Sequence, residues 1–232
     1  MPLPRKAIIL FWFLGFPLLM FGGLVVSAFV VPSQYATTQS AERTFMIEHD
    51  FTKVRKTLVR KDGAKQIIAM GGGSEFVDQQ WDDGAASTDS DNLGAALLKN
   101  VVSSDPDWRL ELKGVLKVRT KDDYIGEHIV TLDQRVEIVP DSLDSKVDLR
   151  EPAERLLEYQ MGTRFERDPE TKTTRVTLSL LQEIMTDAPW FAHAYADGRV
   201  LESVEKTLAN QETAIQQFIE ENVGDAPLFP LR

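Results

Sequence analysis

The sequence predicts an α+β protein in which sequential antiparallel strands are followed by one long amphipathic helix, with a transmembrane helix in front. Between residues 108 and 184, apolar side chains alternate with polar ones, as in strands that have one buried face. From residue 200 to residue 223 the apolar spacing changes to three and four residues, which is typical of a helix. Residues 7–31 contain no charged side chain at all.

Composition and net charge exclude several classes of protein. The chain has 232 residues and a formal net charge of −10, and because residues 1–31 carry only Arg5 and Lys6, the remainder is more acidic still. A domain with this negative charge repels the backbone phosphates of DNA and RNA, so we expect no nucleic-acid partner. The chain contains no cysteine, which excludes disulfides, thiolate metal sites and cysteine nucleophiles.

The N-terminal segment is interpreted as a membrane anchor. At about 1.5 Å per residue, residues 7–31 would form a helix of about 37 Å, longer than a hydrocarbon core of about 30 Å. Basic residues precede this span, so residues 1–6 are placed in the cytoplasm and the C-terminal domain outside it, in the periplasm if the cell is bacterial. The alternative is a signal peptide cleaved after Ala28. Residues 32–42, which are small and polar, are interpreted as a linker.

The first elements of the body are short. Alternation over residues 44–50 predicts a strand, and residues 51–70 predict one or two short helices that are interrupted at Gly63. The glycines at 71–73 indicate a turn, since no P-loop pattern surrounds them. Residues 82–92 are acidic and turn-rich, but they do not match a calcium-loop pattern and are expected to form a loop. Residues 93–102 fit a short helix or a buried strand equally well.

The following region is expected to be a sheet built as a sequential meander, because the connections between its strands are short. The alternation predicts five strands, at residues 108–119, 125–139, 143–149, 157–165 and 174–184. Thr186 and Asp187 are expected to cap the final helix, with Pro189 in its first turn and a kink or break at Gly198. Residues 224–232 are too rich in proline to continue that helix.

Three segments together resemble the START-related helix-grip superfamily, which includes polyketide cyclase-like (SRPBCC-like) proteins. They are RTFMIEHDFTKVRKTL at 43–58, TRVTLSLLQEIM at 174–185, and the helix-forming segment at 189–221. The resemblance covers residues 43–223 and contains no diagnostic short motif. It implies a curved sheet that wraps around the C-terminal helix, with an apolar cavity between them that accepts a lipid or another hydrophobic molecule.

Strand parity gives candidate residues for such a cavity. If even positions of 126–138 and odd positions of 157–165 point inward, polar side chains lie among apolar ones, where they could orient a ligand. With the first strand and the final helix, the candidates are His49, His128, Gln134, Tyr159, Thr163, Val204 and Leu208. The alternative is that the polar members bond to one another or to water in a filled core.

Little in the sequence indicates catalysis. The three histidines, His49, His128 and His193, are not spaced as helical zinc ligands, and neither a HExxH nor a GxSxG motif is present. We therefore expect no metal, no cofactor and no assigned catalytic residue, and a dyad of His49 and His128 is the one acid–base arrangement left open. The sequence favours a protein that is not an enzyme.

Two functions fit these observations. The first is a membrane-tethered, extracytoplasmic domain that binds a lipid or other hydrophobic small molecule, with residues 7–31 contacting the membrane. The second is a structural or interaction protein of the cell envelope whose core is closed. An open pocket between the strands and residues 200–219 would favour the first function, and a packed interior would favour the second. No protein partner can be named from the sequence.

Overall fold

The computed structural model describes residues 33–60, 63–82, 109–120 and 126–224. In chain order the elements are β1 (Gln34–Ile47), α3 (Phe51–Arg60), α4 (Gly63–Gly71), β2 (Ser74–Trp81), β3 (Leu110–Thr120), β4 (Ile129–Ile138), β5 (Ser142–Leu149), β6 (Leu156–Arg167), β7 (Thr174–Asp187), the short 3₁₀ helix η2 (Trp190–Ala192) and α6 (His193–Asn222).

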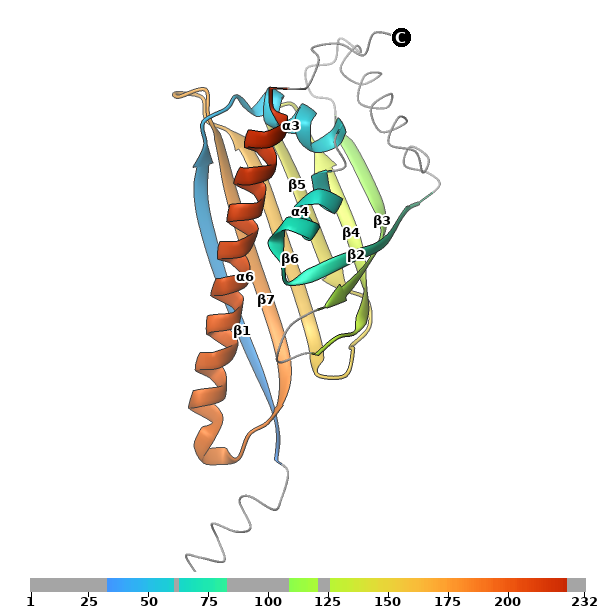
Figure 1. Cartoon of the computed structure of the whole chain (residues 1–232), viewed down its shortest axis with the longest axis vertical. Helices are drawn as coiled ribbons and strands as arrows, with labels where there is room; N and C mark the ends of the chain where they lie inside the picture. Colours follow the sequence, from blue (N-terminus) through green and yellow to red (C-terminus); the bar gives the residue numbers. More distant parts are fainter. Residues whose placement is uncertain (1–32, 61–62, 83–108, 121–125, 225–232) are drawn as a thin grey trace, which may run out of the picture.

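The seven strands form one antiparallel sheet in the order β1-β7-β6-β5-β4-β3-β2. Each strand from β2 to β7 pairs with the next one along the chain, which confirms the predicted meander. The first strand closes the other edge by pairing with the last, from Gln34 opposite Asp187 to Ile47 opposite Thr174. The curved sheet holds α6 against its concave side, with α4 beside that helix (Figure 1). This is an architecture of the helix-grip type, as the sequence predicted.

The predicted linker at residues 32–42 is wrong, because residues 34–42 are the first nine of the fourteen residues of β1. The side chains of these residues are small and polar, so the sequence there lacks the apolar alternation that would have predicted a strand. Thr37 lies on the inner face and is buried, yet its hydroxyl is satisfied because it donates a 2.6 Å hydrogen bond to Asp197 of α6. The inner face of this part of β1 is polar because it is covered by the start of α6, which presents the carboxylate of Asp197.

The strand β2 was not predicted. Its pairing with β3 shifts register between Phe76 and Asp78, and such a bulge breaks the alternation that marks a strand in a sequence. At its end Trp81 lies opposite Gly114 of β3, where a Cβ atom would overlap the carbonyl oxygen of Gln80. Glycine at position 114 thus allows the backbone of β2 to approach β3 closely.

The final helix begins later than predicted. Residues 186 and 187 do not cap it but end β7, and Pro189 precedes η2, so that α6 starts at His193. The helix is continuous through Gly198, without the predicted break. The apolar stripe is confirmed, since it is buried against β1, β7 and α4 through Val200, Val204, Leu208, Ile215, Phe218 and Ile219.

Several predictions fall outside the described residues: the anchor at 7–31, the loop from residue 83, the run at 93–102 and the tail from residue 225. Among the residues that the structure describes, no helix has both the length and the apolar character needed to cross a bilayer.

Candidate ligand-binding cavity

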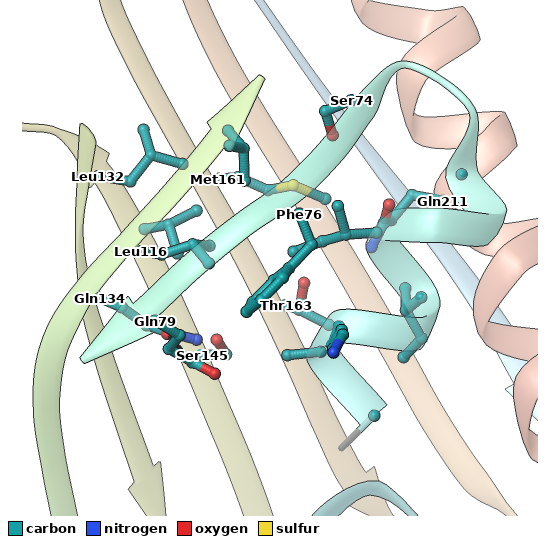
Figure 2. Close-up of a pocket in the computed structure, with 18 of the residues that line it drawn as sticks. Ser74, Phe76, Gln79, Leu116, Leu132, Gln134, Ser145, Met161, Thr163 and Gln211 are labelled. Atoms are coloured by element: carbon teal, nitrogen blue, oxygen red, sulfur yellow. Dashed lines mark hydrogen bonds between the residues drawn. The ribbon is translucent and has the colours of Figure 1, made fainter. Parts of the chain in front are cut away.

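A cavity of about 520 Å³ lies between the inner face of the sheet and the helices α3, α4 and α6. This volume is within the range of about 300–1,000 Å³ that small-molecule sites occupy. The helix α6 packs on β1 and β7, whereas α4 contacts α6 and β2, and α3 contacts β6. The cavity is the space that this arrangement leaves over the inner faces of β3 to β6. Figure 2 shows side chains from these strands converging on the space.

The walls are mainly apolar. Strands β3 and β4 present alternate residues to the cavity, and β6 and α4 add further apolar groups. These side chains are Leu112, Leu116, Val118, Val130, Leu132, Val136, Met161, Phe165, Ile67 and Ile68. A surface of this kind favours an apolar occupant, because removing apolar surface from water on both sides stabilises the complex by roughly 25 cal/mol per Å².

Neutral polar groups interrupt this apolar lining. Gln79 of β2 donates a 2.6 Å hydrogen bond to Gln134 of β4, so these two amides fix each other's orientation. Ser145 lies opposite Thr163 in the pairing of β5 with β6, and both side chains line the cavity (Figure 2). Hydroxyls and amides can both donate and accept hydrogen bonds, so they suit an uncharged polar group on a ligand.

Tyr159 supplies a hydroxyl that lacks a strong partner. It lines the cavity beside Gln182, its partner in the pairing of β6 with β7, and its hydroxyl donates to the sulfur of Met161 at 3.4 Å. A thioether is a weak acceptor. Burial raises the pKa of Tyr159 to about 12, so the phenol remains a donor at neutral pH. A ligand oxygen would be a better acceptor than the sulfur.

The raised pKa of Tyr159 predicts a pH dependence of stability. An unfolded tyrosine ionises near pH 10, whereas the folded Tyr159 stays protonated to about pH 12. The contribution of this pKa difference to the free energy of unfolding is therefore complete below pH 10 and is lost as the pH rises toward 12. We expect the free energy of unfolding of the native chain to fall by up to about 2 kcal/mol more than that of Tyr159→Phe over this interval. Urea unfolding of the full chain in a mild detergent, followed by circular dichroism, measures both. Parallel pH curves for the two proteins would contradict the prediction.

Charge is nearly absent from the lining. Lys65 of α4 is its one charged residue among those described, and it is exposed, with its Nζ atom 5.3 Å from the centre of the Phe76 ring. Across the described part of the chain, no three histidine or acidic side chains gather in a way that could hold a metal ion. The lining offers hydrogen bonds and apolar contact, and no carboxylate or imidazole among its described residues.

Three of the seven candidate residues lie on the cavity wall: Gln134, Tyr159 and Thr163. Their strand parity was interpreted correctly, and their role toward a ligand stays a prediction. Val204 and Leu208 are instead buried in the core with Phe45 and Val176. The cavity meets the neighbouring face of α6, through Thr207, Asn210, Gln211 and Ile215.

The two candidate histidines are not brought together. The Nε2 atom of His128 lies 2.9 Å from a carboxylate oxygen of Glu154, and that of His49 lies 3.5 Å from a carboxylate oxygen of Glu220 on α6. Neither imidazole lines the cavity. The dyad left open by the sequence is therefore not formed.

Several lining residues were missed by the sequence analysis. Those on α4 and β2 escaped because a single short helix and a bulged strand gave no cavity-facing pattern. Thr207, Asn210 and Gln211 belong to the polar side of an amphipathic helix, which is normally assigned to solvent. The signal that could have identified them is their position on α6, where they lie directly beside the apolar stripe.

Comparison with known proteins yields structural neighbours alone, since no protein-family model and no curated protein matches the sequence. A Staphylococcus aureus protein of unknown function has a TM-score of 0.49 at 8% identity, over 80% of this chain and 96% of that one. Ara h 8.0201 has a TM-score of 0.43 at 13% identity, over 80% and 99%. A point mutant of Thalictrum flavum norcoclaurine synthase, in complex with a transition-state analogue, has a TM-score of 0.43 at 11% identity, over 81% and 97%. These likenesses concern the path of the chain and say nothing of ligand or activity.

Proposed function

We propose that this protein is a membrane-tethered domain that binds an uncharged hydrophobic small molecule, such as a lipid, in the cavity between the sheet and the helices. The observation that carries the proposal is the cavity of about 520 Å³, whose lining is apolar except for neutral hydrogen-bonding groups and Lys65. A closed core, which the alternative interpretation as an interaction protein requires, would have no such space.

The lining also indicates the chemistry of the occupant. Burying a charge without a partner is costly, and the interior of the cavity provides no charged partner among the described residues. The buried part of the ligand is therefore uncharged. Tyr159 and the amides of Gln134 and Gln182 can hydrogen-bond to a hydroxyl or carbonyl group. We infer a long or polycyclic apolar molecule with a few oxygen atoms, held without covalent chemistry.

The tether belongs to the same proposal. Residues 7–31 are long enough and apolar enough to span a bilayer, and the basic residues before them favour a cytoplasmic N-terminus and an extracytoplasmic domain. Because β1 begins at Gln34, almost no chain separates this segment from the folded domain. A domain held this close to a bilayer could exchange an apolar ligand with it.

Native mass spectrometry of the full chain, released from a mild detergent in the spectrometer, tests the proposal. We expect one co-purified apolar molecule per chain that survives collision energies at which detergent and loosely attached lipid are lost. The matched control is Ser145→Phe, in which the cavity is partly filled. Equal retention of the same molecules by both proteins, or no retention from a panel of lipids, would favour the interaction protein.

A further inference from the structure

Three large aromatic side chains are exposed together at one end of the domain. Trp190 and Phe191 of η2 and Tyr195 in the first turn of α6 have exposed fractions of 69%, 52% and 72%. We call these three residues the terminal aromatic patch. The other large exposed apolar residues are scattered on different strands, as is usual for a protein surface. Aromatic side chains gathered in this way generally mark an interaction surface.

The terminal aromatic patch lies on a part of the fold that is held in place by contacts between β1 and the start of α6. Directly behind it, the ring of Tyr35 on β1 stacks on His193, with ring centres 3.7 Å apart and planes inclined by 5°. The hydroxyl of Tyr35 donates a 2.9 Å hydrogen bond to Asp197. Trp190 meets Phe191 edge to face, with centres 5.8 Å apart. The start of α6 is thus fixed on β1, and the aromatic side chains project from a defined position.

This end of the domain is also the end from which the N-terminal segment leaves. Ser33 donates a 2.7 Å hydrogen bond from its hydroxyl to the carbonyl oxygen of Ala188, and Gln34 pairs with Asp187. The start of β1, the end of β7 and the start of α6 meet at the lower end in Figure 1, whereas the β6–β7 turn lies at the other end. The described chain therefore begins at Ser33, close to the terminal aromatic patch, and in the sequence the uncharged residues 7–31 end two positions before it.

Charged side chains near the terminal aromatic patch are ion-paired or hydrogen-bonded within the domain. Arg155 contacts Asp187 at 2.9 Å, Arg199 contacts Glu202 at 2.8 Å, and Asp197 accepts hydrogen bonds from Tyr35 and Thr37. This surface is not a basic cluster that would select anionic lipids. It combines large aromatic rings with charged groups that are ion-paired or hydrogen-bonded within the domain, which suits the headgroup layer of a bilayer, where tryptophan and tyrosine are enriched.

We propose that Trp190, Phe191 and Tyr195 insert into the headgroup layer of the bilayer that holds residues 7–31, and so dock the domain on that membrane in one orientation. The proposal rests on the tether in the proposed function. A second copy of the chain is the less suitable occupant. From their exposed fractions, the three side chains offer roughly 400 Å², about half of what one partner contributes to a standard protein interface.

The absence of cysteine from the chain allows a direct test. In Ala194→Cys, a nitroxide is attached at an exposed position of α6 beside the terminal aromatic patch, which stays intact. In Glu170→Cys the same label is attached at the exposed β6–β7 turn, at the far end of the domain. The full chain is reconstituted into phosphatidylcholine vesicles and recovered by flotation. Electron paramagnetic resonance then compares the collision of each label with oxygen, which partitions into lipid, and with a water-soluble nickel complex.

We expect the chain to float with the vesicles and the label at position 194 to be roughly five-fold better protected from the nickel complex than the label at 170. Replacing all three aromatics by serine in the Ala194→Cys background should remove this protection without changing flotation. Equal accessibility at positions 194 and 170 in floating protein would overturn docking and leave the tether standing. Protein that does not float would overturn both. Protection from oxygen as well, with spin–spin broadening between labels, would show a second copy on the patch and also overturn the proposal.

Discussion

Replacing Ser145 with phenylalanine is expected to reduce the retained ligand at least about ten-fold while leaving the domain folded. The Ser145 side chain lines the cavity near Thr163 (Figure 2). Its partners in the sheet are Val136 on β4 and Thr163 on β6, and both also line the cavity. A phenyl ring there occupies space that the apolar part of a ligand would fill. Because the ring enters an existing cavity and not a packed core, we expect the free energy of unfolding to change by less than about 1 kcal/mol.

The matched control is Lys146→Phe. Lys146 is the next residue of β5, is exposed and lies on the outer face of the sheet, where it pairs with Gly162. The same ring at this position should leave ligand retention unchanged. Native mass spectrometry compares the two variants with the native chain, and circular dichroism monitors their folding. If both variants keep the ligand, it is bound elsewhere, for example along residues 7–31.

The sheet could be predicted because burial on one face leaves a period of two in the sequence. Five strands were found in this way, and the parity of β4 and β6 correctly turned Gln134, Tyr159 and Thr163 inward. The strands that escaped lack an unbroken period of two, for two different reasons. β2 contains a bulge, and the first half of β1 buries Thr37 against a carboxylate of α6. Such compensation between distant segments leaves no local pattern.

The helix side of the cavity was predicted less well for a different reason. An apolar stripe shows which face of α6 is buried, but it does not show whether that face meets a packed core or a cavity. Val204 and Leu208 lie at the centre of the stripe and pack on β1 and β7, whereas the cavity meets its edge at Gln211 and Ile215. That division depends on α6 lying over one half of the sheet only, which is a property of the tertiary arrangement.

Leu208→Ala is expected to have the opposite effect to Ser145→Phe, with a large loss of stability and no loss of affinity. Leu208 is 1% exposed and belongs to the same core cluster as Phe45 and Val176. Removing most of a buried leucine side chain costs about 2–5 kcal/mol, because apolar contacts are lost and a void remains. Since Leu208 is not part of the cavity lining, the fraction of folded chains that carry ligand should match that of the native protein.

Urea unfolding of the full chain in a mild detergent measures the first quantity, and native mass spectrometry of the folded fraction measures the second. Glu205→Ala is the control on the same helix, since Glu205 is exposed and its replacement should change the free energy of unfolding by less than about 0.5 kcal/mol. Stability loss with ligand retained assigns Leu208 to the core that holds α6 on the sheet. A ten-fold loss of ligand without a loss of stability would instead place the ligand between α6 and β1. The cavity between the sheet and the helices would then not be the binding site.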